Sequence, residues 1–124
     1  MAGEQNIERA KQGYAAFDSG DAQTAMQDIA DDVEWIVPGE SAISGTYHGK
    51  QEVLGLFGKL AEKGFSQREQ YWFSDDERVV LLKEVTLDGQ QSDAVDVLTY
   101  RDGKLVKYQG AGDTALQERI WGRK

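Results

Sequence analysis

The sequence predicts an α+β fold in which helices come first and one curved antiparallel sheet follows. Before Phe65, apolar residues recur at three- and four-residue spacing, which is typical of amphipathic helices. From Phe65 onward, runs rich in β-branched and aromatic residues alternate with turn sequences, which is typical of an antiparallel meander. Helices grouped before strands favour a single sheet packed against those helices.

Three helices are expected in the first half of the chain. The first ends at Ser19-Gly20, and Asp21 is the expected N-cap of a second helix that reaches Ile29 and ends at Asp31-Asp32. The third helix is expected over Gln51–Glu62. Their apolar faces are, in order, Ile7, Ala10, Tyr14 and Phe17; Ala22, Ala25, Met26 and Ile29; and Val53, Leu56, Phe57 and Leu60.

The expected strands are short and separated by turn residues. A first strand, Val33–Val37, ends at Pro38-Gly39 and leads into a Ser/Gly-rich loop. The later strands are expected over Phe65–Phe73, Arg78–Leu87, Asp93–Tyr100 and Leu105–Tyr108. Asp88-Gly89 and Asp102-Gly103 separate consecutive runs, and Asp-Gly between two such runs is a strong hairpin signal. A short C-terminal helix is expected near Thr114, with Asp113 as its N-cap.

The composition narrows the possible functions. The chain has 124 residues, which fits one domain over residues 1–124, and its net charge of −8 argues against a nucleic-acid or anionic-membrane partner. It has no cysteine, which rules out disulfides, zinc–thiolate sites and thiol nucleophiles. With one histidine and no nucleotide fingerprint, no metal or cofactor is expected. No apolar run approaches the ~20 residues of a membrane span and no signal peptide is evident, so a cytoplasmic protein is expected.

Several segments, taken in order, resemble the NTF2-like superfamily, and within it the SnoaL-like and ketosteroid-isomerase-like proteins. The segments are Tyr14–Asp21, Ala30–Trp35, Ile43–Lys50, Thr99–Val106 and the pair Asp113-Thr114. The resemblance implies a cone-shaped, cystatin-like fold with a bent sheet around a deep apolar pocket, commonly dimeric through the sheet. The same fold hosts isomerases, cyclases, epoxide hydrolases, dehydratases and non-enzymatic binding proteins, so it does not decide the function.

The resemblance to ketosteroid isomerase implies roles for two residues. Its oxyanion-binding tyrosine corresponds to Tyr14 and its protonated oxyanion-binding aspartate to Asp96, whereas the position of its general base is held by Val37. Asp96 alternates with Ala94 and Leu98 on one strand face, so it is expected to be buried. A buried carboxyl without a cationic partner stays protonated and can donate a hydrogen bond to a ligand oxygen.

Structural roles are equally open for these residues. Tyr14 lies on the apolar stripe of the first helix and fits a packed core tyrosine. Asp96 fits a structural carboxyl held by the backbone or by a neighbouring arginine. His48, the only histidine, is a candidate acid or base for the missing base function, or an exposed loop residue.

Aromatic and apolar residues are expected to line the pocket. The candidates are Trp35, Val37, Phe57, Trp72, Tyr100 and Tyr108. Some relatives carry an acidic residue shortly before the Asp-Thr pair, but this chain has Gln109-Gly110-Ala111-Gly112 there, so the glycines open space instead. That departure argues against a cyclase or epoxide-hydrolase mechanism.

Two functions remain in balance, and a third is less favoured. The chain is either an enzyme that moves a proton on a small apolar carbonyl compound, with Tyr14 and Asp96 as oxyanion donors and His48 or a water as base, or a binding protein for an apolar ligand. A protein that acts only through its sheet face is the third. Along Phe65–Phe73 one strand face must look outward and carry exposed aromatic residues, which predicts a homodimer through the sheet.

Overall fold

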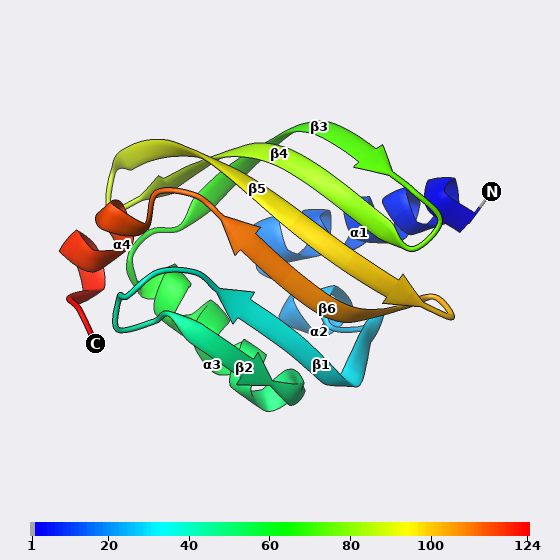
Figure 1. Ribbon diagram of the computed structural model, residues 1–124, viewed down its shortest axis with the longest axis horizontal. Helices are drawn as coiled ribbons and strands as arrows, with labels where there is room; N and C mark the ends of the chain where they lie inside the picture. The colour runs from blue at the N-terminus through cyan, green and yellow to red at the C-terminus, as the bar shows by residue number, and fades with distance from the viewer. Residues whose placement is uncertain (1) are drawn as a thin grey trace.

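The computed structural model describes residues 2–124, which form one six-stranded curved sheet with helices over its concave face (Figure 1). The elements in chain order are α1 (Ala2–Asp18), α2 (Ala22–Ala25), β1 (Ile29–Val37), β2 (Gly45–His48), α3 (Gly49–Glu62), β3 (Ser66–Ser74), β4 (Arg78–Leu87), β5 (Gln90–Arg101), β6 (Lys104–Ala111) and α4 (Thr114–Trp121). This architecture confirms the predicted α+β class.

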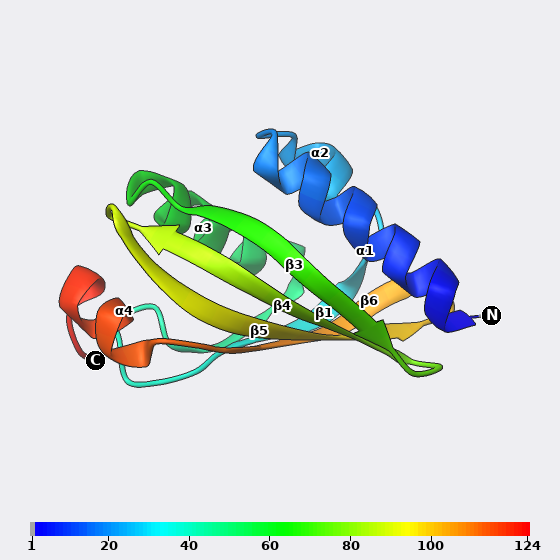
Figure 2. The ribbon, with the colours of Figure 1, turned by 90° about the horizontal axis from the view of Figure 1, so that it is seen from above.

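The sheet has the strand order β2-β1-β6-β5-β4-β3. Strands β3 to β6 form the predicted antiparallel meander, but β1 pairs with β6 in parallel. The prediction of a wholly antiparallel sheet is therefore wrong at this one pair. Figure 2 shows α1, α2 and α3 on one side of the sheet and α4 at its end; among the described residues no helix covers the opposite face.

Two elements differ from the sequence-based expectation. The second helix is a single turn, and Ile29 already begins β1, so Asp31 and Asp32 lie exposed within a strand rather than at a helix end. The apolar residues between Ala22 and Ile29 do include core positions, since Met26 and Ile29 are buried. Met26, however, lies in the turn after α2, and Ile29 is the first residue of β1. Strand β2 replaces part of the predicted loop, because four residues beside β1 complete the sheet edge.

The turns follow the predicted turn chemistry. Asp88, Gly89, Asp102 and Gly103 have φ angles of 51°, 76°, 52° and 77°, and two consecutive left-handed residues define the hairpin turn that Asp-Gly favours. Asp21 and Asp113 cap α2 and α4 by accepting hydrogen bonds from backbone N–H groups, as expected.

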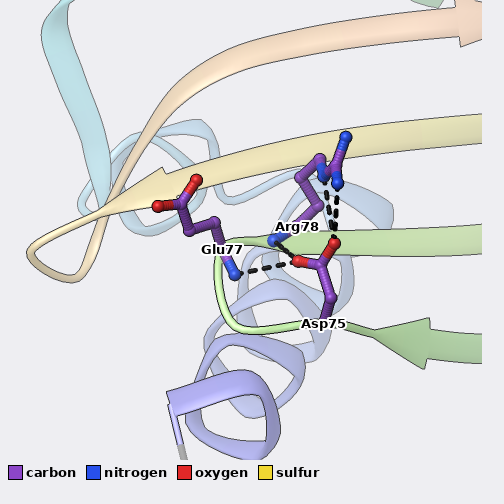
Figure 3. Close-up of polar contacts among 3 residues, drawn as sticks. All are labelled: Asp75, Glu77 and Arg78. Atoms are coloured by element: carbon purple, nitrogen blue, oxygen red, sulfur yellow. Dashed lines mark hydrogen bonds and ion pairs between the residues drawn. The ribbon is translucent and has the colours of Figure 1, made fainter.

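The β3–β4 turn is organised by Asp75 (Figure 3). Its carboxylate accepts hydrogen bonds from the backbone N–H groups of Glu77 at 2.9 Å and Arg78 at 2.7 Å, and from the Arg78 side chain at 2.9 Å. The backbone N–H groups hold the pKa of the Asp75 carboxyl below its ordinary value. This acidic turn is therefore structural, since its charge stabilises the reversal of the chain.

The main core lies between the concave face of the sheet and α1 and α3. Its buried members are Ala10, Met26, Ile29, Val33, Val53, Val79, Leu98, Tyr100 and Leu105. A second cluster of Val37, Ile43 and Leu56 packs against Trp121 near the C-terminal helix. Within residues 2–124, no helix is both long enough and apolar enough to cross a membrane.

Candidate functional site

A cavity of about 190 Å³ lies on the concave face, between the sheet and the helices. Apolar side chains make up most of its wall, as in typical ligand pockets. The predicted residues that line it are Tyr14, Trp35, Val37, Phe57, Asp96, Tyr100 and Tyr108.

Asp96 is the centre of a buried polar cluster on the cavity wall, and only 1% of its surface is exposed. The Tyr14 hydroxyl, from α1, donates to Asp96 Oδ2 at 2.5 Å, and the Tyr108 hydroxyl, from β6, donates to Asp96 Oδ1 at 2.7 Å. Lys83 Nζ, from β4, lies 2.7 Å from Asp96 Oδ2. Four elements therefore meet at one carboxylate, which accepts from three donors.

Lys83 reaches Asp96 because it occupies an inward position of β4. The residues Val79, Leu81, Val85 and Leu87 share that face and are buried, and Lys83 itself is only 6% exposed. In the register of the sheet Leu81 pairs with Asp96 and Lys83 with Ala94, so the two charged residues are diagonal neighbours. A buried ion pair of this kind is tolerated because each charge compensates the other.

The Asp96 environment differs from the expected oxyanion arrangement. That arrangement required a carboxyl without a cationic partner, but Lys83 supplies that partner. The Tyr14 hydrogen is directed at Asp96 and is therefore not free for a ligand. The structural interpretation named an arginine as the neighbour, whereas the cation is a lysine.

Both tyrosine hydroxyls remain proton donors within this cluster. Burial, followed by the negative charge of Asp96, raises the pKa of Tyr14 and of Tyr108 well above the ordinary value. Each phenol oxygen that donates to Asp96 still has lone pairs that can accept a hydrogen bond. The hydroxyl hydrogens of both tyrosines therefore point at Asp96, and the phenol oxygens keep lone pairs that can accept a hydrogen bond.

Lys83 links the buried cluster to the surface of the protein. Its ammonium donates to Gln67 Oε1 at 2.7 Å, and Gln67 Nε2 donates to the exposed Asp18 at 2.8 Å. Next to this series of hydrogen bonds, burial and a hydrogen bond with Asp18 raise the pKa of the Glu69 carboxyl to about 7. Lys83 and Gln67 were not predicted as site residues, although a lysine within an alternating apolar run indicates an inward-facing charge at position 83.

An aromatic wall fixes the tyrosines of the cluster. Tyr108 stacks on Trp35 with ring centroids 4.0 Å apart, and Trp35 meets Phe57 edge-on at 5.4 Å. Trp72 packs edge-on against Tyr14 at 5.5 Å but does not line the cavity, so its predicted pocket role is wrong. It supports Tyr14 instead of facing a ligand.

Neither candidate position for a base provides one. Val37 lines the cavity, as expected, with an apolar side chain packed on Ile43 and Leu56. His48 is exposed at the start of α3, outside the cavity lining, and its backbone N–H donates to Glu52. The hypothesis that His48 replaces the base does not fit this position, because the side chain does not face the cavity.

Gly110 makes room for the Tyr108 hydroxyl. It pairs with Asp96 across the sheet, and a Cβ built on it would lie 2.8 Å from the Tyr108 hydroxyl oxygen. A methyl group at this distance would displace the phenol. The space that Gly110 and Gly112 were predicted to open is therefore occupied in part by the Tyr108 hydroxyl.

Gly110→Ala is expected to destabilise the protein by about 1–3 kcal/mol, since it separates Tyr108 from Asp96 and leaves a buried acceptor under-satisfied. Urea unfolding measures this change. In a Tyr108→Phe background the same substitution should have a much smaller effect, because the displaced hydroxyl is absent. Gly55→Ala, in α3 with no atom within 4 Å of the new Cβ, is the control and should stabilise by up to about 1 kcal/mol. Equal costs in both Tyr108 backgrounds would contradict the argument.

The sequence and the fold of this chain are similar to those of known proteins. The sequence profile of the SnoaL-like domain matches residues 10–108. The uncharacterized protein Rv0034 of Mycobacterium tuberculosis strain H37Rv is 30% identical over 128 residues, covering 95% of this chain and 90% of the relative.

Solved structures agree with this match. Bal32a, from a soil-derived mobile gene cassette, superposes with a TM-score of 0.89 at 25% identity, covering 99% of this chain and 100% of that one. TerC, co-crystallized with polyporic acid, has a TM-score of 0.80 at 26% identity, covering 94% of this chain and 97% of its own. Both likenesses extend over nearly the whole chain.

Proposed function

Because the chain belongs to the SnoaL-like domain family, as its match over residues 10–108 shows, we propose that it binds a small, largely apolar carbonyl compound in its cavity. The observation that carries this proposal is the buried Lys83–Asp96 pair on the wall of an otherwise apolar cavity. TerC, a structural neighbour crystallized with polyporic acid, supports small-molecule binding by this fold.

Lys83 supplies the contact that would orient the ligand. An ammonium has three N–H donors, and among the described residues two of them have partners, Asp96 and Gln67. The third donor is the group that a ligand carbonyl oxygen would accept from. A hydrogen bond to a charged donor is stronger than one between neutral groups, so it fixes the polar end of the ligand.

Binding is better supported than proton-transfer catalysis. Both carboxylate oxygens of Asp96 already have partners, two tyrosine hydroxyls and the Lys83 ammonium, so Asp96 is not placed to take a proton from a ligand. Val37 brings no titratable group to the cavity, and His48 lies outside its lining. The isomerase-like interpretation would need a base that these positions do not supply.

The cavity size suggests probes of about one ring. A cavity of about 150 Å³ is known to bind benzene, and this one measures about 190 Å³. Acetophenone and α-methylstyrene have nearly the same shape but differ in the carbonyl oxygen. Calorimetry is expected to show that the wild-type protein binds acetophenone roughly tenfold more tightly than α-methylstyrene, because only the ketone accepts a hydrogen bond from the charged donor.

A variant without the ion pair provides the control. Lys83→Met with Asp96→Leu removes both charges together, so neither is left buried alone. With Tyr14→Phe and Tyr108→Phe added, so that no hydroxyl released from Asp96 can replace the ammonium as donor, this variant should bind both probes with similar affinity. Absence of binding by either probe to the wild type would refute the cavity as a ligand site, and equal binding by the wild type would refute the role of Lys83.

We further propose that the uncovered face of the sheet pairs with a second copy of the chain. Tyr71 and Phe73 on β3 are 62% and 57% exposed, and Leu82 on β4, which pairs with Tyr71, is 37% exposed. Grouped exposed apolar residues on a soluble protein typically mark an interface. A two-fold pairing is the commonest way to close such a surface.

A further inference from the structure

One residue of the cavity wall carries a buried side-chain oxygen that has no hydrogen-bond partner. Among the residues that the structure describes, Gln117 Oε1 is the one buried side-chain oxygen or nitrogen left unpaired. Gln117 lines the same cavity as Lys83 and Asp96, although it lies on α4 rather than on the strands. Buried polar atoms in folded proteins nearly always have a partner, so this exception calls for an explanation.

The unpaired oxygen does not result from a loosely held helix. At the start of α4, Asp113 accepts a hydrogen bond from the Leu116 N–H at 2.9 Å, and Leu116 is buried. After the helix, the Gly122 carbonyl accepts from the Ala42 N–H at 2.7 Å, and the Lys124 N–H donates to the Glu40 carbonyl at 2.9 Å. Both ends of α4 are fixed, so the position of the Gln117 backbone beside the cavity is set by the fold.

The segment of the cavity wall that leads into α4 contributes no side-chain donor. The last residues of β6 and the link to α4 that line the cavity are Gly110, Ala111, Gly112 and Asp113. Their side chains carry no N–H or O–H group. An amide oxygen only accepts hydrogen bonds, so its natural partner is a hydroxyl or an N–H group of a molecule in the cavity.

We propose that Gln117 accepts a hydrogen bond from a hydroxyl or N–H group of the bound ligand and selects for that group. This inference rests on the proposed binding function of the cavity and narrows its ligand class. The ligand then carries two polar groups on a small apolar frame: a carbonyl oxygen for Lys83 and a hydrogen-bond donor for Gln117. Hydroxyaryl ketones are the simplest compounds of this kind.

Paired probes test the selection. The hydroxyl of 3- or 4-hydroxyacetophenone is replaced by a methyl group of similar size in 3- or 4-methylacetophenone. Calorimetry should show that the wild type binds at least one hydroxy isomer about tenfold more tightly than its methyl partner. In Gln117→Met, which keeps the side-chain length, the hydroxy probe should weaken to the level of the methyl probe, while the methyl probe binds unchanged or more tightly.

The outcomes separate this inference from the function on which it depends. If the wild type binds both members of each pair equally, or if Gln117→Met keeps the preference, a water satisfies the oxygen and the role of Gln117 is refuted while the cavity function stands. If no acetophenone binds the wild type, both the cavity function and this inference fail. An unfolding midpoint for Gln117→Met that is equal to or higher than that of the wild type shows that the variant is folded, so that a lost preference does not result from lost structure.

Discussion

Asp96→Ala is expected to lower the free energy of unfolding by about 3–5 kcal/mol, the usual result of removing one partner of a buried ion pair. The substitution leaves the Lys83 ammonium, only 6% exposed, without its carboxylate. It also removes the acceptor of the Tyr14 and Tyr108 hydroxyls. Urea unfolding followed by tryptophan fluorescence measures the loss, with Trp35 and Trp72 packed directly on the two tyrosines.

Two further variants distinguish a buried charge from a general loss of packing. Asp96→Leu combined with Lys83→Met should recover the part of the stability that is lost to the unpaired ammonium, although the two tyrosine hydroxyls still lack their acceptor. Asp31→Ala breaks the exposed Lys50–Asp31 pair, 3.3 Å apart, and should change stability by less than about 1 kcal/mol. A double variant as unstable as Asp96→Ala alone would show that the charges are not the cause.

Tyr71→Glu with Phe73→Glu is expected to convert the proposed dimer into a monomer. Both side chains are exposed in the single chain, so the substitutions should leave its folding intact. In a dimer through this face they would place carboxylates in an apolar contact without partners, which opposes association strongly. Sedimentation equilibrium at micromolar concentration measures the change in mass.

The matched control for the dimer keeps the apolar surface. Tyr71→Phe preserves the ring and should stay dimeric, and Arg68→Ala tests the charged edge of the same strand, where Arg68 pairs with Glu84 at 3.6 Å. A wild-type protein that sediments as a monomer at micromolar concentration would count against the proposed interface. So would a double glutamate variant with unchanged mass.

Local patterns were sufficient to predict most of the fold. Asp-Gly turns specify their own backbone conformation, so the hairpins at Gly89 and Gly103 followed from two residues each. The length of α2 did not follow, since helical spacing over Ala22–Ile29 is equally satisfied by one helical turn and the start of a strand. The parallel pairing of β1 and β6 depends on contacts between residues distant in sequence, which no local pattern encodes.

The candidate site was predictable only in part, for the same reason. Strand alternation correctly placed Asp96 inward, and helix spacing placed Tyr14 on the face that meets it. Lys83 required the register between β4 and β5, and Gln117 required the position of α4 over the cavity. The two alternatives for His48, a base or an exposed loop residue, stayed open because a turn residue before a helix gives no indication of which way its side chain points; the structure has it exposed.

The parallel pairing of β1 with β6 has a consequence for synthesis on the ribosome. Tyr14 and its partner Asp96 are separated by 82 positions, and Tyr108 is made later still. The early helices and β1 therefore emerge long before the strand that completes the sheet beside them. Until β6 is translated, the apolar concave wall stays open to water and to other nascent chains. The dependence of the cavity on its last strand makes this the stage at which the growing chain is most exposed to aggregation.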